Sequence, residues 1–229
     1  MVPAPTLNHS PNPPLTPDTW RMAHGASAFG CVTQNQVMRI LSFPEEATPS
    51  ELRVQVLELQ HQAWPSDGDG PAPGAPTHDP ALKPLSMLLM DGGRVLSALD
   101  ILSKEIVHAG QRFAAGGLST VVTHREARGS GHGRRLATAA RDMMIARNLD
   151  LGLFTCDRPL QAFYESAGWH LLPGTVVIGG TPRAPFPSDR LGFDKVTMAD
   201  FFSAASRQAQ ASFQHTRIEL YPGEHDKLW

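Results

Sequence analysis

Residues 121–136 read Val-Val-Thr-His-Arg-Glu-Ala-Arg-Gly-Ser-Gly-His-Gly-Arg-Arg-Leu and join an apolar, β-branched run to a helix-like segment at 136–149. Three glycines alternate with other residues in between, and glycine lets the backbone turn tightly and expose its N–H groups. Such groups at a helix N-terminus attract an anion, because the helix dipole is positive there. Arg128, Arg134 and Arg135 add cationic donors. The stretch therefore predicts a strand, a turn and a helix that together hold a pyrophosphate.

A Gly-rich turn of this length can also be a plain connection between a strand and a helix. The stretch lacks the Gly-Lys-Ser/Thr ending of a P-loop. It also lacks the strict G-x-G-x-x-G spacing of a dinucleotide-binding fingerprint, since Arg134 to Leu136 follow Gly133. Neither of those two nucleotide-binding motifs is therefore indicated.

The whole chain has 229 residues, of which 41% are hydrophobic, and this suits one domain with a sizeable core. Its formal net charge of -2 gives no electrostatic basis for binding nucleic acid or an anionic membrane. We find no apolar run of membrane-spanning length and no secretory signal pattern. Cys31, Cys156 and the histidines show no metal-ligand spacing. We therefore expect a cytoplasmic protein without a metal ion.

The order of predicted elements indicates an α/β or α+β domain with a mixed sheet. A Pro-rich leader, 1–36, is expected to be mobile or loosely docked, and a single domain with a C-terminal extension spans 37–229. Hydrophobic periodicity predicts strands at 37–43, 85–90, 94–107, 113–123 and 151–155, with closing strands at 170–179 and 195–198. Helices are predicted at 48–64, capped by Thr48, and at 136–149, 159–167 and 199–211. Long Gly/Pro-rich loops occupy 66–84 and 180–193.

Two segments together resemble the GNAT superfamily of N-acetyltransferases. R-x-x-G-x-G at 128–133, after a V-x-T strand end, is similar to the acyl-CoA-binding motif of that superfamily. Ala-Phe-Tyr-Glu-Ser-Ala-Gly-Trp at 162–169 is similar to its A-x-x-F-Y-E-x-x-G-F segment. The resemblance covers about residues 37–179 and implies a mostly antiparallel sheet, flanked by helices, whose parallel strands at 121–123 and 151–155 splay apart. It implies acetyl-CoA as co-substrate, held by Val121, Val122, Thr123, Arg128, Gly129, Ser130, Gly131, His132, Gly133, Arg134 and Asp157.

Acetyl transfer to an amine has three chemical requirements. The attacking amine must lose a proton to a base, directly or through water. A backbone N–H must stabilise the oxyanion of the tetrahedral intermediate, and the leaving thiolate benefits from a proton donor. The resemblance assigns the oxyanion donor to the Val121 N–H, pairing with pantetheine to Thr123, and the general acid to Tyr164. Tyr164 can also be only a packed tyrosine on an amphipathic helix, as Phe163 is expected to be.

Within the superfamily, the chain looks most like the aminoglycoside 2′-N-acetyltransferases. Acidic residues in the 66–84 loop match a region that binds the ammonium groups of the antibiotic in that family. The chain also ends, as those enzymes do, in an acidic segment closing on tryptophan, where the terminal carboxylate faces the acceptor. The substrate-binding residues implied for this chain are Asp67, Asp69, Asp79, Ser119, Asp226 and Trp229, and Trp229 is also a catalytic candidate.

The chain departs from that family at Ser119, which replaces a strand carboxylate and cannot act as the base. The role of base is then open between Asp79, Trp229 and a water chain. Asp157 stands where many relatives carry Asn near CoA. The acidic residues can also be ordinary solvated loop charges.

The sequence thus predicts an N-acetyltransferase that acts on a small, aminoglycoside-like amine by direct attack in a ternary complex. Its expected partners are the small-molecule amine and, in a homodimer, a second copy of the chain. Three alternatives stay open: a GNAT enzyme for another amine such as a polyamine or a peptide N-terminus, a non-catalytic acyl-CoA sensor, and a plain structural domain.

Overall fold

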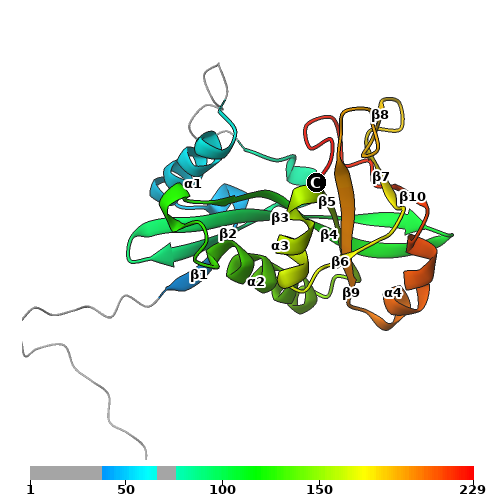
Figure 1. The fold of residues 1–229 in the computed structure, drawn as a ribbon, viewed down its shortest axis with the longest axis horizontal. Helices are drawn as coiled ribbons and strands as arrows, with labels where there is room; N and C mark the ends of the chain where they lie inside the picture. The colour runs from blue at the N-terminus through cyan, green and yellow to red at the C-terminus, as the bar shows by residue number, and fades with distance from the viewer. Residues whose placement is uncertain (1–37, 66–75) are drawn as a thin grey trace, which may run out of the picture. The chain divides into compact units, whose positions relative to one another are not determined.

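The central sheet has seven strands in the order β1-β2-β3-β4-β5-β9-β6 (Figure 1). This computed structural model describes residues 38–65 and 76–229. The strands are β1 (Arg39–Pro44), β2 (Leu85–Asp91), β3 (Arg94–His108), β4 (Gln111–Thr123), β5 (Leu151–Asp157), β9 (Lys195–Phe201) and β6 (His170–Leu171). All neighbouring pairs are antiparallel except β4 and β5. The mixed, mostly antiparallel sheet predicted from the sequence is confirmed.

Helices cover both faces of the sheet because its inner strands are apolar on both sides. Leu59 of α1 (Ser50–Ala63) packs in one cluster with Leu88, Ala98 and other residues of β2, β3 and β4. The second cluster contains the strand residues that alternate with those of the first, such as Leu99, and it includes Leu136 of α2 (His132–Ala146). Since successive residues of a strand point to opposite faces, α1 and α2 lie on opposite sides of the sheet. Between them the two helices enclose the strands that carry the functional residues.

The parallel strands β4 and β5 pair at only two positions and then separate. Their register joins Ala115 to Leu151 and Gly116 to Gly152, and no further pair follows. Trp229 occupies the opening: its indole N–H donates to the Leu153 carbonyl at 2.8 Å. A side chain on Gly117 would collide with this indole, so the close approach requires glycine there. The predicted splay is confirmed, and the end of the chain lies inside it.

A second, three-stranded sheet is built from the C-terminal part of the chain. Its order is β10 (Arg217–Glu219), β7 (Val176–Gly180) and β8 (Pro185–Pro187), with β10 and β7 parallel. The Gly180 N–H donates to the Lys227 carbonyl at 2.8 Å, and the Gly223 N–H donates to the Gly180 carbonyl at 3.0 Å. The last residues of the chain therefore return along the end of β7 before they reach the opening between β4 and β5.

Two predicted elements are wrong in part. The single strand expected at 170–179 is interrupted at Pro173-Gly174, where Gly174 has a φ of +64°, and the chain passes from β6 in the first sheet to β7 in the second. The helix expected at 199–211 starts too early, because Ala199 to Phe201 complete β9 opposite β5. The helix α4 (Ala204–Ala209) begins after Ser203, whose hydroxyl accepts a hydrogen bond from the Ser206 N–H.

The predicted helix starts need two further corrections. The helix α2 begins at His132, four residues before Leu136, because Gly131 takes a left-handed conformation and its carbonyl accepts the first helical hydrogen bond from Arg135. Thr48 does not cap α1, which begins after Pro49 without a side-chain cap. By contrast, the predicted stop of α3 (Gln161–Ser166) at Gly168 agrees with its φ of +89°. Within the described part of the chain, no helix is long and apolar enough to cross a membrane.

Candidate active site

A cleft of about 760 Å3 lies between the end of β4, the Gly-rich turn, the N-terminus of α2 and α3. Its lining contains all ten predicted cofactor-binding residues between Val121 and Arg134, which are Val121, Val122, Thr123, Arg128, Gly129, Ser130, Gly131, His132, Gly133 and Arg134. Ala63, Ala127, Leu160, Phe163 and Tyr164 complete the walls. The structure therefore brings the two sequence motifs together around one cavity.

The Gly-rich turn offers backbone N–H groups toward this cleft. Gly129 and Gly131 have φ values of +80° and +79°, which glycine adopts without strain. A Cβ at Gly129 would meet no atom within 4 Å, so the turn stays open to a ligand. Gly133 has another role: a Cβ there would come within 3.0 Å of the Thr123 hydroxyl, so glycine lets α2 start directly against β4. This combination of left-handed glycines and a helix N-terminus suits an anion.

The end of β4 carries a bulge beside the cleft. Ala98 pairs with Val122 and Asp100 pairs with Ser119, so Leu99 alone faces both Thr120 and Val121. Thr120 has a φ of +48°, which is rare for a β-branched residue. The bulge reorients the backbone at Val121, the predicted oxyanion donor, at the point where β4 has left β5.

Tyr164 lies on α3. Its ring is buried and forms part of the wall of the cleft. The ring packs edge-on against Phe154 and Phe163, with centroid distances of 4.9 and 4.8 Å. Burial, assisted by Cys156 and Asp157, raises the pKa of the Tyr164 hydroxyl far above its usual range. The hydroxyl therefore stays protonated at neutral pH and can donate a proton to a leaving thiolate.

On β5, Cys156 is poorly suited to act as a nucleophile and Asp157 is poorly placed to bind the cofactor. Burial, with the neighbouring Asp157 carboxylate, raises the pKa of the Cys156 thiol to about 11, so Cys156 is not a nucleophilic thiolate. The exposed Asp157 binds Lys195 at 2.8 Å and lies outside the lining of the cleft. The predicted contact of Asp157 with the cofactor is therefore not supported by its position.

The predicted substrate-binding residues are only partly brought together. Asp67 and Asp69 lie outside the described residues. Asp79 precedes the short helix η2 (Pro80–Leu82) and accepts a hydrogen bond from the Ala81 N–H at 2.9 Å. Ser119 lies half-buried on β4. The carbonyl of Trp229 accepts a hydrogen bond from the Thr155 N–H of β5 at 2.9 Å.

Asp226 takes part in a buried network that sequence reasoning missed. Its carboxylate binds His78 Nδ1 at 2.6 Å and accepts from the Asp79 N–H at 2.9 Å. The other ring nitrogen of His78 lies 3.3 Å from the carboxylate of Asp100 on β3. Burial lowers the pKa of His78, but the hydrogen bonds and charges of Asp100 and Asp226 outweigh it and raise the pKa from 6.5 to about 9. A cationic His78 thus joins the C-terminal segment to the sheet.

This network predicts a loss of stability at alkaline pH. Because the pKa of His78 is higher in the folded state, its protonation stabilises the fold fully below about pH 6.5, and this stabilisation is lost as the pH rises through about 9. The free energy of unfolding should fall by up to about 3 kcal/mol over this range. Urea denaturation at the two pH values measures the decrease. The variant His78→Gln should lack it, whereas other groups such as Lys104 titrate in both proteins; equal decreases in the two proteins would contradict the assignment.

Comparison with protein families gives one match, to the acetyltransferase (GNAT) domain, over residues 46–172, more than half of the chain. The chain belongs to the GNAT family. GNAT enzymes are N-acyltransferases that use acyl-CoA, and the matched segment contains both the Gly-rich turn and the Tyr164 helix. The second sheet of β7, β8 and β10 lies beyond it. No curated protein sequence matches the chain significantly.

Solved structures similar to this GNAT chain are distant in sequence. An acyl-CoA N-acyltransferase from Pseudomonas aeruginosa is 16% identical, with a TM-score of 0.51, over 71% of this chain and 99% of that chain. ElaA from Escherichia coli is 15% identical, with a TM-score of 0.46, over 71% and 99%. Glucosamine-6-phosphate N-acetyltransferase from Arabidopsis thaliana is 14% identical, with a TM-score of 0.47, over 58% and 90%. The likeness to the first of these shows the GNAT fold.

Proposed function

We propose that this GNAT enzyme transfers the acetyl group of acetyl-CoA to a primary amine of a small molecule, by direct attack in a ternary complex. The observation that carries the proposal is the single cleft that joins the Gly-rich turn, the bulged end of β4 and the Tyr164 hydroxyl. A covalent route through Cys156 is disfavoured because its raised pKa keeps it as a thiol.

Each wall of the cleft has a role in this proposal. The turn at 128–134 and the N-terminus of α2 hold the pyrophosphate, and Thr123 on the open edge of β4 pairs with the pantetheine amides. The Val121 N–H stabilises the oxyanion of the tetrahedral intermediate. Tyr164 protonates the departing thiolate, which its position on the cleft wall supports.

We further propose an aminoglycoside-like acceptor on the side of the opening away from the turn. Asp79 supports it, because a polycationic amine selects carboxylates around its pocket. Trp229 lies in the opening itself. Asp79 keeps one carboxylate oxygen, Oδ2, without a hydrogen bond to any described residue, 3.7 Å from where a Cβ on Gly223 would stand. We also propose that the enzyme forms a homodimer, although the residues named for the acceptor all come from one chain.

A second candidate is an acceptor with a single amine, such as a peptide N-terminus. The ion pair between His78 and Asp226 favours it, because Asp226 is neutralised within the protein and contributes no free carboxylate to a polycation. Fewer free carboxylates favour an acceptor with fewer positive charges.

An assay of free thiol release separates these acceptors. Purified protein is given acetyl-CoA with kanamycin B, which carries a 2′-amine, or with kanamycin A, which carries a hydroxyl there. Spermidine and a short peptide with a free N-terminus complete the panel. We expect release with kanamycin B well above that with kanamycin A. Release with the peptide alone would support the second candidate, and absence of acetyl-CoA binding by calorimetry would overturn the proposal.

A further inference from the structure

The attacking amine needs a proton acceptor. Trp229, a candidate base from the sequence, has its carbonyl oxygen bound by the Thr155 N–H in the opening between β4 and β5. Residues 117–123 of β4 carry no ionisable side chain, and Cys156 of β5 stays protonated. A carboxylate nevertheless reaches this part of β4 from the neighbouring strand. Asp100 of β3 accepts a hydrogen bond from the hydroxyl of Thr120, with an oxygen–oxygen distance of 2.5 Å.

Thr120 is held in a conformation that its own backbone disfavours. Its φ of +48° in the bulge of β4 costs free energy for a β-branched residue, and surrounding contacts must offset this cost. The hydrogen bond to Asp100 is such a contact. Thr120 is half-buried and directly precedes Val121, whose N–H is the proposed oxyanion donor.

Asp100 is fixed from three sides beneath α1. Besides Thr120, it accepts a hydrogen bond from the Ser86 hydroxyl at 2.5 Å and contacts His78 Nε2 at 3.3 Å. His78 is in turn held by Asp226 at 2.6 Å. The side chain of Asp100 is 6% exposed, so its position is set by these partners and not by bulk solvent.

A small hollow lies beside Asp100. It has a volume of about 20 Å3, enough for one water molecule, and is lined by Asp100, Ser86, Glu45 and Thr48 among others. The Thr48 hydroxyl is buried without a hydrogen-bond partner in the described part of the chain, and a water molecule in the hollow would provide one.

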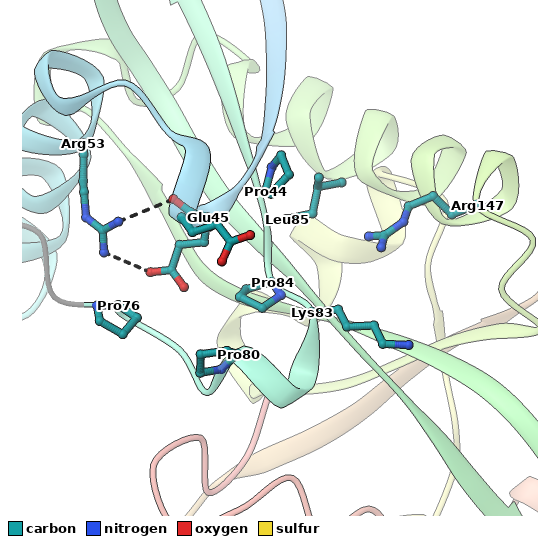
Figure 2. Close-up of a pocket in the computed structure, with 10 residues that line it drawn as sticks. Pro44, Glu45, Arg53, Pro76, Pro80, Lys83, Pro84, Leu85 and Arg147 are labelled. Atoms are coloured by element: carbon teal, nitrogen blue, oxygen red, sulfur yellow. Dashed lines mark hydrogen bonds and ion pairs between the residues drawn. The ribbon is translucent and has the colours of Figure 1, made fainter.

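A larger pocket lies next to the hollow, where β1 ends at Pro44 beside the start of β2 at Leu85. This pocket, of about 470 Å3, shares Glu45 and Arg53 with the hollow. Figure 2 shows the Arg53 guanidinium directed at Glu45. Pro80, Pro84 and Lys83 line its other walls. None of its lining residues lines the cofactor cleft.

From the contacts of Thr120 and Asp100 we infer that these two residues form a proton relay for the acceptor amine. This inference rests on the proposed acetyl transfer. As the amine nitrogen bonds to the thioester carbonyl carbon, its N–H bond breaks and the Thr120 oxygen takes the proton. The original hydroxyl proton of Thr120 passes to Asp100. The intermediate then expels the thiolate, which takes a proton from Tyr164. Asp100 releases its proton to solvent, and Tyr164 regains one from solvent.

The test compares Thr120→Val with Thr120→Ser. Valine has nearly the shape of threonine but lacks the hydroxyl, whereas serine keeps the hydroxyl. With acetyl-CoA and kanamycin B, or spermidine if that is the amine accepted, we expect Thr120→Val to lower kcat by about 30-fold near neutral pH, within the range of general base catalysis. The KM for acetyl-CoA should change by less than about twofold, and Thr120→Ser should restore most of the activity.

The pH profile distinguishes a relay from a structural role. The defect of Thr120→Val should shrink as the pH rises from about 6 to about 8.5, because hydroxide can then take the proton in place of the relay. A defect of constant size at every pH, or a wild-type kcat in Thr120→Val, would overturn the relay. Asp100→Asn provides a second variant with the same expected profile. Wild-type protein without any acetyl transfer would instead overturn the proposed function itself.

Discussion

Gly131→Asp abolishes the binding of acetyl-CoA, with a loss of more than about 100-fold in affinity, or about 3 kcal/mol. Gly131 has a φ of +79° and lines the cleft just before the first residue of α2. A carboxylate there places a negative charge at the helix N-terminus, where the pyrophosphate of CoA would bind. A Cβ on Gly131 would also lie 3.7 Å from the Arg134 guanidinium, so the new carboxylate competes for that cation. Isothermal titration calorimetry measures the effect.

Two control variants separate charge from backbone strain in this experiment. Gly131→Asn has the shape of the aspartate variant without its charge, and should lose clearly less affinity. Gly93→Asp adds the same charge in the turn between β2 and β3, where a side chain would meet nothing within 4 Å, and should bind acetyl-CoA normally. An affinity of Gly131→Asp close to that of the wild type would show that the turn does not hold the pyrophosphate.

Tyr164→Phe lowers kcat by about 100-fold and leaves the KM for acetyl-CoA within about twofold. The variant keeps the ring that packs against Phe154 and Phe163 and removes only the hydroxyl. Since the raised pKa keeps this hydroxyl protonated, its loss removes the proton donor for the thiolate and not a base. The rate of thiol release at saturating amine measures kcat.

Tyr221 offers a matched control, because it is the other tyrosine of the chain and lies outside the lining of the cleft. Tyr221→Phe should keep the wild-type kcat. A Tyr164→Phe enzyme as fast as Tyr221→Phe would remove Tyr164 from the catalytic residues and leave it as a packing residue.

The cofactor cleft could be predicted from the sequence because its signal is local. Gly129, Gly131 and Gly133 determine the turn, and the strand before them and the helix after them are recognisable from hydrophobic periodicity. Tyr164 follows at a spacing typical of the GNAT superfamily, and the structure places it on the same cleft. Patterns of this kind can be recognised in the sequence because each depends on residues that lie close together in the chain.

The network around His78 could not be predicted for the opposite reason. His78 and Asp226 are 148 positions apart, and nothing in either segment distinguishes a buried, paired side chain from a solvated loop charge. The family resemblance implies that Asp226 faces the acceptor, whereas in the structure its carboxylate binds His78. In the same way, Ala199 and Phe201 look helical in isolation, and only pairing with β5 makes them part of a strand.

The separation of β4 from β5 creates two strand edges in the interior of the molecule. An unpaired edge on a protein surface can pair with strands of other molecules and promote aggregation. Here α1 and α2 cover the two faces of the sheet, and Trp229 pairs with part of the β5 edge through Thr155. Among the described residues, Val121 to Thr123 of β4 line the cofactor cleft. The fold thus offers peptide-like hydrogen-bonding groups to a small ligand while sheltering them from intermolecular β-sheet formation.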